Sequence, residues 1–414
     1  MKQALYRIGV ALWASLILSC GKIDHPVDGG KDLVLSPVEQ EKVVQDNRFA
    51  FELFRQSTEA LPINENALLS PLSIGTALAM VNNGARGETR EEINKTLKWE
   101  GFDVETINNY YKKLVHDLPL LDPKTTLHTA NSIWHHQRLS VLPDFLSINK
   151  QFYMAEVAAL DFTDPSAPAD INEWVNAKTS GKIPTIVDVI PANMMMYLIN
   201  AIYFKGSWEQ QFDPSETATG TFRKEANNSV QTDFMNITHK FKVSSDEYAE
   251  AIELPYGNRK YSMVIAKPKD GSTPAQLLEK YKEEGWQSLV SKFGTADVNL
   301  SMPKFKFSYE KQLKNDLTAL GMDLAFSEMA DFLGISTAQK LAISEVKHKS
   351  FIEVNEEGTE AAAVTSVGMI ATSMPQVYTF TVDRPFLFVI REMNTGLILF
   401  VGQVNDPLAQ EAGG

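Results

Sequence analysis

One stretch near the carboxyl end of the chain carries no charge over an unusual length. The segment Ala361–Val382 contains no Asp, Glu, Lys or Arg, and it directly follows the acidic segment 356–360. A surface loop is normally more polar, and an exposed uncharged strand invites edge-to-edge aggregation. A core strand is normally shorter and bulkier. The stretch therefore fits neither an ordinary loop nor an ordinary buried strand.

A period of two residues explains the beginning of this stretch better. If Thr359 points to one face of an extended strand, that face continues with small or apolar side chains at Ala361, Ala363, Thr365, Val367 and Met369. The opposite face starts with Glu360, and Gly358 supplies the backbone freedom of a hinge. Such a strand can enter the middle of a sheet with its uncharged face on the core. The same residues also allow a static, loosely packed strand.

The absence of charge on the inward face has a large energetic weight. Ordering about fourteen residues costs roughly 1–2 kcal/mol each in backbone entropy. About twenty new ladder hydrogen bonds, at about 0.5–1.5 kcal/mol each, only offset that cost. Insertion is then decided by side-chain burial and by strain released elsewhere. One unpaired inward charge costs several kcal/mol and is enough to prevent insertion.

The composition favours a folded domain and argues against a nucleic-acid partner. Of the 414 residues, 44% are apolar and 10% aromatic, which is enough for a sizeable core. The 52 acidic residues outnumber the 39 Lys and Arg, which gives a net charge of −13. A nucleic-acid binder usually carries a basic patch instead. We therefore expect a monomer that binds no nucleic acid.

Helix signals dominate the first half of the chain, and strand signals dominate the second. We expect helices at Glu39–Ala60, from Ser70-Pro71 onward, at Ile171–Thr179 and at Tyr309–Leu320. We expect strands at Thr126–Trp134, Met195–Phe204, Ala251–Leu254, Tyr261–Lys267, Val298–Pro303, Phe386–Arg391 and Ile398–Val401. Because the two kinds are interleaved without regular strand–helix–strand alternation, the sequence predicts one mixed α+β domain.

The amino end has the features of an export signal. Lys2 and Arg7 precede a mostly apolar run, Ile8–Leu18, which is too short to span a bilayer but suits the core of a signal peptide. The following Cys20 is the sole cysteine of the chain. The sequence around it, Ile17-Leu18-Ser19-Cys20-Gly21, resembles the lipobox of bacterial lipoproteins, with Leu18 as a mild departure. A plain secretory signal is the alternative.

The export signal implies a division of the chain into three parts. We expect a signal peptide over residues 1–19, a flexible tether over residues 20–37 and a folded domain over residues 38–410. A diacylated Cys20 would anchor the protein in a membrane of the bacterial cell envelope, at the outer membrane or surface. With a plain signal, the protein would be secreted.

The sequence carries no recognisable signal for a catalytic or metal site. The seven histidines include the pair His135-His136, but such a pair more often places one ring inside and one outside at the end of a strand. No histidine lies in an HExxH motif, and a single cysteine excludes a CxxC site. GxSxG, P-loop and GxGxxG motifs are absent. We expect no catalytic residue, no metal and no cofactor.

Motifs spread along the chain resemble those of the serpin family, in the family's order. The hinge of an inhibitory serpin is matched by Glu356, Gly358, Thr359, Glu360, Ala361, Ala362 and Ala363. The family's shutter and breach residues are matched by Ser70, Ser73, Asn200, Lys205, Trp208 and His348. Further matches lie at residues 83–89, 254–256, 330–335 and 383–388. The resemblance covers residues 38 to 408, and the motifs are specific in combination although each alone is weak.

The resemblance implies a fold and a mechanism. A serpin has three β-sheets and eight to nine helices, with an exposed reactive loop outside the large sheet. Its target protease attacks the loop and forms an acyl-enzyme, which is trapped when the cut loop enters the sheet as a new strand. Counting along the loop from Glu356, as in the family, places the reactive bond at Thr372-Ser373. The neighbouring Met369, Ile370, Ala371 and Met374 are also cleavable side chains.

The residues of the loop indicate the class of target. Because Ala361–Val382 contains no Lys or Arg, trypsin-like proteases are not expected. Elastase-like or subtilisin-like serine proteases are the expected partners, and papain-like cysteine proteases are a further class. A non-inhibitory serpin that serves as a binding or carrier module is the main alternative. An enzyme is the third.

Overall fold

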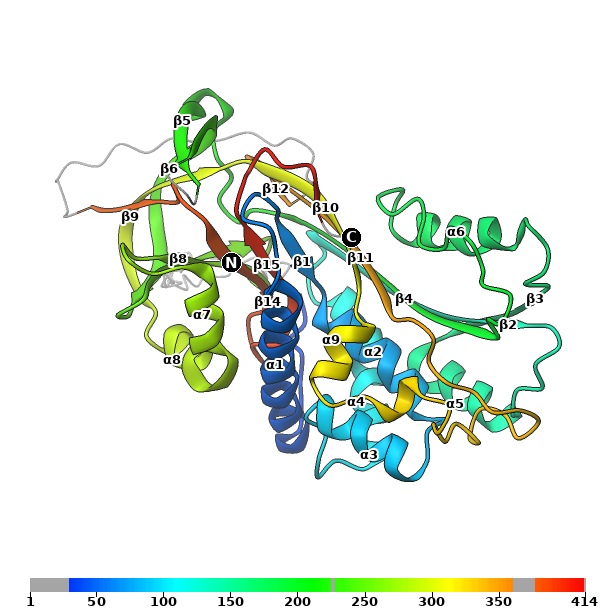
Figure 1. The fold of residues 1–414 in the computed structure, drawn as a ribbon. Helices are drawn as coiled ribbons and strands as arrows, with labels where there is room; N and C mark the ends of the chain where they lie inside the picture. Colours follow the sequence, from blue (N-terminus) through cyan, green and yellow to red (C-terminus); the bar gives the residue numbers. More distant parts are fainter. Residues whose placement is uncertain (1–29, 225–227, 360–376, 413–414) are drawn as a thin grey trace, which may run out of the picture.

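The computed structural model describes residues 30–224, 228–359 and 377–412 (Figure 1). The helices in these ranges are α1 (Pro37–Thr58), α2 (Pro71–Asn82), α3 (Gly87–Thr96), α4 (Val104–Asp117), α5 (Pro143–Tyr153), α6 (Ala167–Lys178), α7 (Pro274–Lys280), α8 (Trp286–Ser291) and α9 (Lys314–Ala319). Short helical turns are η1 (Leu118–Leu120), η2 (Pro214–Glu216), η3 (Tyr281–Gly285) and η4 (Leu324–Phe326). None of these helices is both long enough and apolar enough to cross a membrane.

The strands form two hydrogen-bonded sheets. They are β1 (Ala67–Leu69), β2 (Thr125–His136), β3 (Glu156–Leu160), β4 (Met196–Ser207), β5 (Ala218–Arg223), β6 (Ser229–Ser245), β7 (Ala249–Tyr256), β8 (Tyr261–Pro268), β9 (Gly294–Pro303), β10 (Phe305–Gln312), β11 (Lys347–Asn355), β12 (Gly358–Thr359), β13 (Tyr378–Thr381), β14 (Phe386–Glu392), β15 (Ile398–Val404) and β16 (Glu411–Ala412). Each of the seven expected strands overlaps an observed strand.

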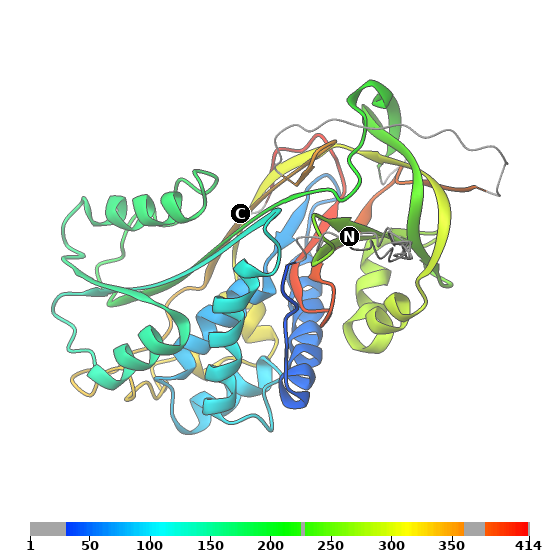
Figure 2. The ribbon, with the colours of Figure 1, turned by 180° about the vertical axis from the view of Figure 1, so that it is seen from behind.

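A seven-stranded sheet crosses the molecule in the order β16-β10-β11-β12-β4-β2-β3. Helix α6 lies over one face of this sheet, while α2 and the other helices of the first half pack beneath the opposite face (Figures 1 and 2). Along β11, inward and outward side chains alternate between buried and half-buried, as a period of two requires. The sheet therefore has one face on the main core and one under α6.

The second sheet has nine strands, in the order β1-β15-β14-β8-β7-β6-β9-β13, with β5 paired to β6. The long strand β6 bends between two partners. Its residues 234–243 pair with β9, and its residues 242–245 pair with β7. The resemblance predicts three sheets, but the described strands form two. The strands expected for the third sheet are continuous with this sheet, because β6 pairs with β9 along one part of its length and with β7 along another.

Local signals in the sequence account for the starts of two helices. Ser36 and Glu39 form a capping box at α1, in which each side chain accepts a hydrogen bond from the other residue's backbone N–H. At α2, the Ser70 side chain accepts from the Ser73 N–H, and Pro71 occupies the first turn. The predicted helix start at Ser70-Pro71 is confirmed.

The predicted helix over Tyr309–Leu320 is wrong in its first part. Strand β10 continues to Gln312, and α9 contains only Lys314–Ala319. The two-residue alternation that begins at Phe305 extends through Tyr309, and β10 pairs with β11 along its whole length. The long ladder therefore overrides the local helix propensity of these residues.

The chain packs onto the domain before α1 begins. Leu33 and Leu35, at the end of the predicted tether, are buried in the main core. Lys260 forms an ion pair with Asp32 at 2.8 Å. The described part of the segment is thus held against the domain from residue 32 onward.

Candidate insertion site and hinge

The short strand β12 lies between β11 and β4 in the middle of the seven-stranded sheet. Thr359 pairs with Val354 of β11 and Gly206 of β4, and Gly358 pairs with Asn355 and Ser207. Both pairings are antiparallel. Strand β12 is therefore a two-residue strand that has entered the sheet from one end, directly after the turn that follows β11.

Glycine is required at position 358 by a close approach of two backbones. Its φ of +151° is one that side-chain-bearing residues rarely adopt. A Cβ atom added at Gly358 would lie 2.1 Å from the carbonyl oxygen of Gly206 and 2.7 Å from the Cα of Ser207. Both distances are far below contact, so only glycine permits β12 to pair with β4.

Thr359 is held by a buried tyrosine. Its hydroxyl lies 2.7 Å from the Tyr256 hydroxyl, and Thr359 is only 2% exposed. Burial raises the pKa of Tyr256, so the phenol stays protonated. The Trp208 ring stacks on Tyr256 with centroids 4.5 Å apart and planes 12° apart. The first inserted side chain thus enters a preformed, uncharged pocket.

Trp208 also fixes the turn that precedes the hinge. Its indole N–H donates to the Asn355 carbonyl at 2.9 Å, and its backbone N–H donates to the Glu357 carbonyl at 2.9 Å. The Phe212 N–H donates to the Glu356 carbonyl at 3.0 Å. These three bonds connect the end of β11 to the segment that follows β4.

The Glu356 carboxylate anchors the turn through its side chain. It accepts a hydrogen bond from the Thr217 hydroxyl at 2.8 Å and forms an ion pair with Lys304 at 3.3 Å. Burial raises the pKa of Glu356, but the hydrogen bonds and the Lys304 charge outweigh burial and lower it. Glu356 is therefore ionised at neutral pH, and its ion pair and hydrogen bond fix the turn between β11 and β12.

A cavity of about 470 Å³ lies farther along the gap between β4 and β11, toward the opposite end of these strands from β12. In the described chain, β4 and β11 pair with each other only through β12. The cavity lies between residues 196–200 of β4 and residues 347–349 of β11, against one face of α2. Its walls include Ser73, Leu78, Tyr197, Asn200, Val346 and His348. The space that a longer β12 would occupy is thus partly open.

Two of the predicted shutter residues meet at one end of α2. His348 is buried on β11, and its Nε2 accepts a hydrogen bond from the Ser70 N–H at 3.2 Å. The Ser70 hydroxyl donates to the Leu399 carbonyl at 2.8 Å. This arrangement connects the large sheet, α2 and β15, and it needs a neutral imidazole because Nε2 accepts a hydrogen bond.

Asn200 lies on β4 and faces the same cavity as Ser73 and His348. Its amide nitrogen donates to the Asn131 side chain at 2.6 Å. Its side-chain oxygen is buried and has no partner among the described residues. An unpaired buried acceptor costs about 1–3 kcal/mol, so a donor from a strand that fills the cavity would relieve this cost.

Lowering the pH should destabilise the protein through His348. Burial lowers its pKa to about 4, against about 6.5 in an unfolded chain. The unfolded state therefore binds the extra proton between these values, and about 3 kcal/mol of stability is lost as the pH falls through this window. Urea unfolding at pH 7 and pH 4.5 measures most of this loss. A His348→Gln variant should lose about that much less, and equal losses in both proteins would contradict the assignment.

The structure brings together most of the described residues that the sequence singled out. Glu356, Gly358, Thr359 and Trp208 meet at the hinge, and Ser70, Ser73, Asn200 and His348 surround the cavity. Lys205 lies half-buried on β4, opposite Thr126. The remaining predicted site residues lie outside the described residues: Cys20, Glu360, Ala361, Ala362, Ala363, Thr372 and Ser373.

Sequence reasoning missed the partners of the hinge. Tyr256 belongs to a motif that the resemblance includes, but nothing in the sequence pairs it with Thr359, 103 positions away. Lys304 lies 52 positions from Glu356, between β9 and β10, where the alternation of the sequence indicates only secondary structure. Among the described residues, His, Asp and Glu side chains form no cluster of three that could hold a metal ion.

Comparison with known proteins identifies the family. The family model for the serpin, a serine protease inhibitor, matches residues 44–407. The chain is a serpin. It has the α+β fold of this family, which is described as serine protease inhibitors and not as enzymes.

Individual relatives agree with this assignment. Leukocyte elastase inhibitor A of Mus musculus is 37% identical over 382 residues, which cover 87% of this serpin and 97% of the relative. The native state of tengpin, a thermophilic serpin, superposes with a TM-score of 0.83 at 33% identity, covering 91% of this chain and 97% of tengpin. The latent state of tengpin superposes with a TM-score of 0.77 at 31% identity, covering 90% and 99% of the two chains.

Proposed function

We propose that this serpin is a suicide substrate that traps elastase-like or subtilisin-like proteases. One observation carries the proposal: β12 has already entered between β4 and β11, and a cavity lies farther along between the same two strands. The large sheet is thus prepared to accept a longer strand. Papain-like cysteine proteases form a second class of targets with the same acyl-enzyme chemistry.

The first step is an ordinary proteolytic attack. The protease nucleophile attacks the carbonyl carbon of Thr372, the Thr372-Ser373 bond breaks, and the new amino group leaves with Ser373. Thr372 remains joined to the protease as an ester, or as a thioester with a cysteine protease. This serpin supplies the substrate bond and the strand but no catalytic group.

The second step is insertion of the cut segment beside β4. In continuous register, Ala361, Ala363, Thr365 and Val367 share the face of Thr359, which is buried against Tyr256. None of these side chains is charged. The inserted segment gains ladder hydrogen bonds to β4 and to β11, with alternate residues bonded to each strand, while the cavity fills. The protease is carried with the segment, and deacylation stalls when its catalytic groups lose their alignment.

The choice of target rests on the loop sequence and on the relatives. No Lys or Arg lies between Ala361 and Val382, so this segment offers no basic side chain to the primary specificity pocket of a trypsin-like protease. The similar protein of Mus musculus is named leukocyte elastase inhibitor A. Small and medium-sized side chains such as Thr372 suit the small primary pocket of an elastase.

Incubation with pancreatic elastase tests this function. We expect a covalent complex that survives SDS and boiling, and mass spectrometry should find the new carboxyl end at Thr372. Trypsin at the same concentration serves as the control and should give no complex. Clean cleavage near Thr372 by elastase without any complex would show that the protein is a substrate and not an inhibitor.

The proposal extends to location, through Cys20. A lipobox-like sequence around the sole cysteine favours a bacterial lipoprotein that is anchored in the cell envelope. In a bacterial host, the full chain should sediment with membranes, and Cys20→Ser should move it to the soluble fraction. An unchanged distribution in the variant would refute the anchor and favour a plain secretory signal.

A further inference from the structure

The strand β10 has a hydrogen-bonding edge that the rest of the sheet barely uses. On one side, β10 pairs with β11 through eight residue pairs. On the other side, it pairs only with the two-residue strand β16, at Ser308 and Tyr309 (Figure 1). The remaining residues on this side have no ladder partner among the described strands. An open strand edge is a template for pairing with another chain.

Alternate residues of β10 present their backbone groups to this open edge. The Ser308 N–H donates to the Gln410 carbonyl, just before β16, at 3.0 Å. Because the direction of the N–H and C=O groups alternates along a strand, Lys306 and Glu310 present theirs to the same edge. Their side chains lie on the outer face of the sheet, with exposed fractions of 58% for Lys306 and 35% for Glu310. A strand from another molecule can therefore bond to residues 306, 308 and 310 in turn.

The sequence along this edge is complementary to itself. It reads Lys306-Phe307-Ser308-Tyr309-Glu310. When two copies pair antiparallel with their Ser308 residues opposite each other, Lys306 of each copy lies opposite Glu310 of the other. Opposite charges in such cross-strand positions are stabilising. The same register brings residues 306, 308 and 310 of both copies together, so about six hydrogen bonds form across a two-fold axis.

The acidic member of this charge pair is ionised and has room for a further lysine. Glu310 forms ion pairs with Lys347 at 2.8 Å and with Lys349 at 3.1 Å. Burial raises the pKa of Glu310, but the hydrogen bonds and charges of these two lysines outweigh burial and lower it. A carboxylate offers about four acceptor sites, so Lys306 of a second copy joins this group without displacing either lysine. Lys306 itself forms an ion pair with Glu353 at 3.2 Å, near the surface.

The carboxyl-terminal residues of the same chain cover the centre of this edge. We call residues 410–412 the tail. The tail follows a turn after β15 that is held by the fully buried Asn66. The Asn66 side-chain oxygen accepts from the N–H groups of Asn405 at 2.8 Å and Asp406 at 3.0 Å, and its amide donates to the carbonyls of Asp406 at 2.8 Å and Ala409 at 3.4 Å. This turn directs the tail onto Ser308, on which the two-fold pairing is centred.

We propose that the β10 edge is a dimerisation surface for a second copy of this serpin, and that the tail keeps this surface closed. With the tail in place, the central Ser308 is occupied and the protein is a monomer. When the tail leaves, two copies join through antiparallel β10 strands, and their large sheets become continuous. The gap between β4 and β11 lies on the other side of β11, so this dimer still traps proteases. The inference goes beyond the proposed function and does not depend on it.

Two variants that open the edge test this proposal. One is a chain that stops at Leu408, and the other is the full-length Glu411→Pro, in which proline removes a backbone N–H and disturbs β16. Sedimentation velocity should show a monomeric wild type, whereas both variants should dimerise with a dissociation constant of about 1–100 µM, as expected for a small interface. Hydrogen exchange at residues 306–310 of both variants should become slower as the protein concentration rises. A chain that lacks only residues 413 and 414 is the matched control and should stay monomeric.

A charge reversal in the shortened chain tests the register. Lys306→Glu places two carboxylates opposite each other at both ends of the pairing, so it should weaken the dimer about tenfold or more. Lys306→Arg keeps the charge and should dimerise like the shortened chain alone. Lys150→Glu makes the same charge change at an exposed position of α5 and should have no effect.

Three results would overturn the proposal. The first is that both opened variants stay monomeric up to about 100 µM, well above the expected dissociation constant. The second is a dimer that Lys306→Glu leaves unchanged. The third is association that disappears once elastase has cut the loop, because the contact would then lie at the loop and not at β10. Sedimentation and exchange need no trapping, so a failure to trap elastase would count only against the proposed function.

Discussion

Thr359→Arg is expected to convert the inhibitor into a substrate. Thr359 is 2% exposed between β11 and β4, and its hydroxyl touches the buried Tyr256 hydroxyl. A guanidinium group at this position would find no carboxylate in the contacts described for Thr359, and burying it would cost several kcal/mol. Insertion then becomes slower than hydrolysis of the acyl-enzyme. The protease is released, and the serpin is cleaved without forming a stable complex. Densitometry of elastase reactions should show at least about tenfold less complex per cleaved molecule.

Two controls separate insertion from general damage. Thr359→Ser keeps the hydroxyl that meets Tyr256 and should trap elastase nearly as well as the wild type. Thr295→Arg introduces the same charge at an exposed position of β9 and should have no effect on trapping. Unchanged trapping by Thr359→Arg would refute the role of the uncharged inward face.

Trp208→Ala is expected to have the largest effect on stability. Trp208 is 3% exposed, stacks on Tyr256 and donates its indole N–H to the Asn355 carbonyl. Removing such a side chain leaves a cavity and an unpaired carbonyl, at a cost of about 3–5 kcal/mol. Denaturant unfolding of the uncleaved protein should measure this loss. Hydrogen exchange at residues 355–359 should also become faster, because the turn loses its anchor.

Trp174→Ala provides the comparison. Trp174 lies half-buried on α6, and its indole N–H donates to the Glu156 side chain at the surface. Truncation there should cost clearly less stability and should leave exchange at the hinge unchanged. Equal losses in the two variants would show that Trp208 is ordinary core packing with no special role at the hinge.

Strands were the more predictable part of this fold. The apolar runs at β14 and β15 are buried at every residue, and a continuous run is what the sequence shows. The boundary between β10 and α9 was mistaken because the residues after Tyr309 have helix propensity, whereas their ladder partner β11 lies far along the chain. Pairing over such a distance leaves no local mark on the sequence.

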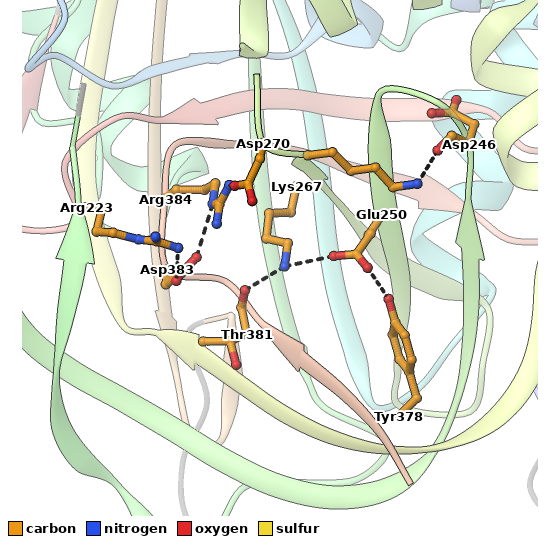
Figure 3. Close-up of polar contacts among 10 residues, drawn as sticks. Arg223, Asp246, Glu250, Lys267, Asp270, Tyr378, Thr381, Asp383 and Arg384 are labelled. Atoms are coloured by element: carbon orange, nitrogen blue, oxygen red, sulfur yellow. Dashed lines mark hydrogen bonds and ion pairs between the residues drawn. The ribbon is translucent and has the colours of Figure 1, made fainter. Parts of the chain in front are cut away.

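The hinge could be predicted from the sequence, but the residues that contact it could not. The spacing of Gly358 and Thr359 before an uncharged run indicated a strand able to insert. Tyr256 lies on β7 of the other sheet and Lys304 between β9 and β10, and only the folded chain brings them near the hinge. The hydrogen bond from Tyr378 of β13 to Glu250 of β7 is a similar case, since the two residues are 128 positions apart (Figure 3). Pairs of this kind follow from topology and not from local pattern.

Thermal unfolding before and after a single cut in the loop tests the central claim most directly. If the cut segment becomes a strand between β4 and β11, the cleaved serpin gains ladder hydrogen bonds and fills the cavity of about 470 Å³. Its melting temperature should then rise by about 10 °C or more above that of the uncleaved protein. An unchanged or lower melting temperature after the cut would contradict insertion and would favour a serpin that binds or carries a ligand without trapping proteases.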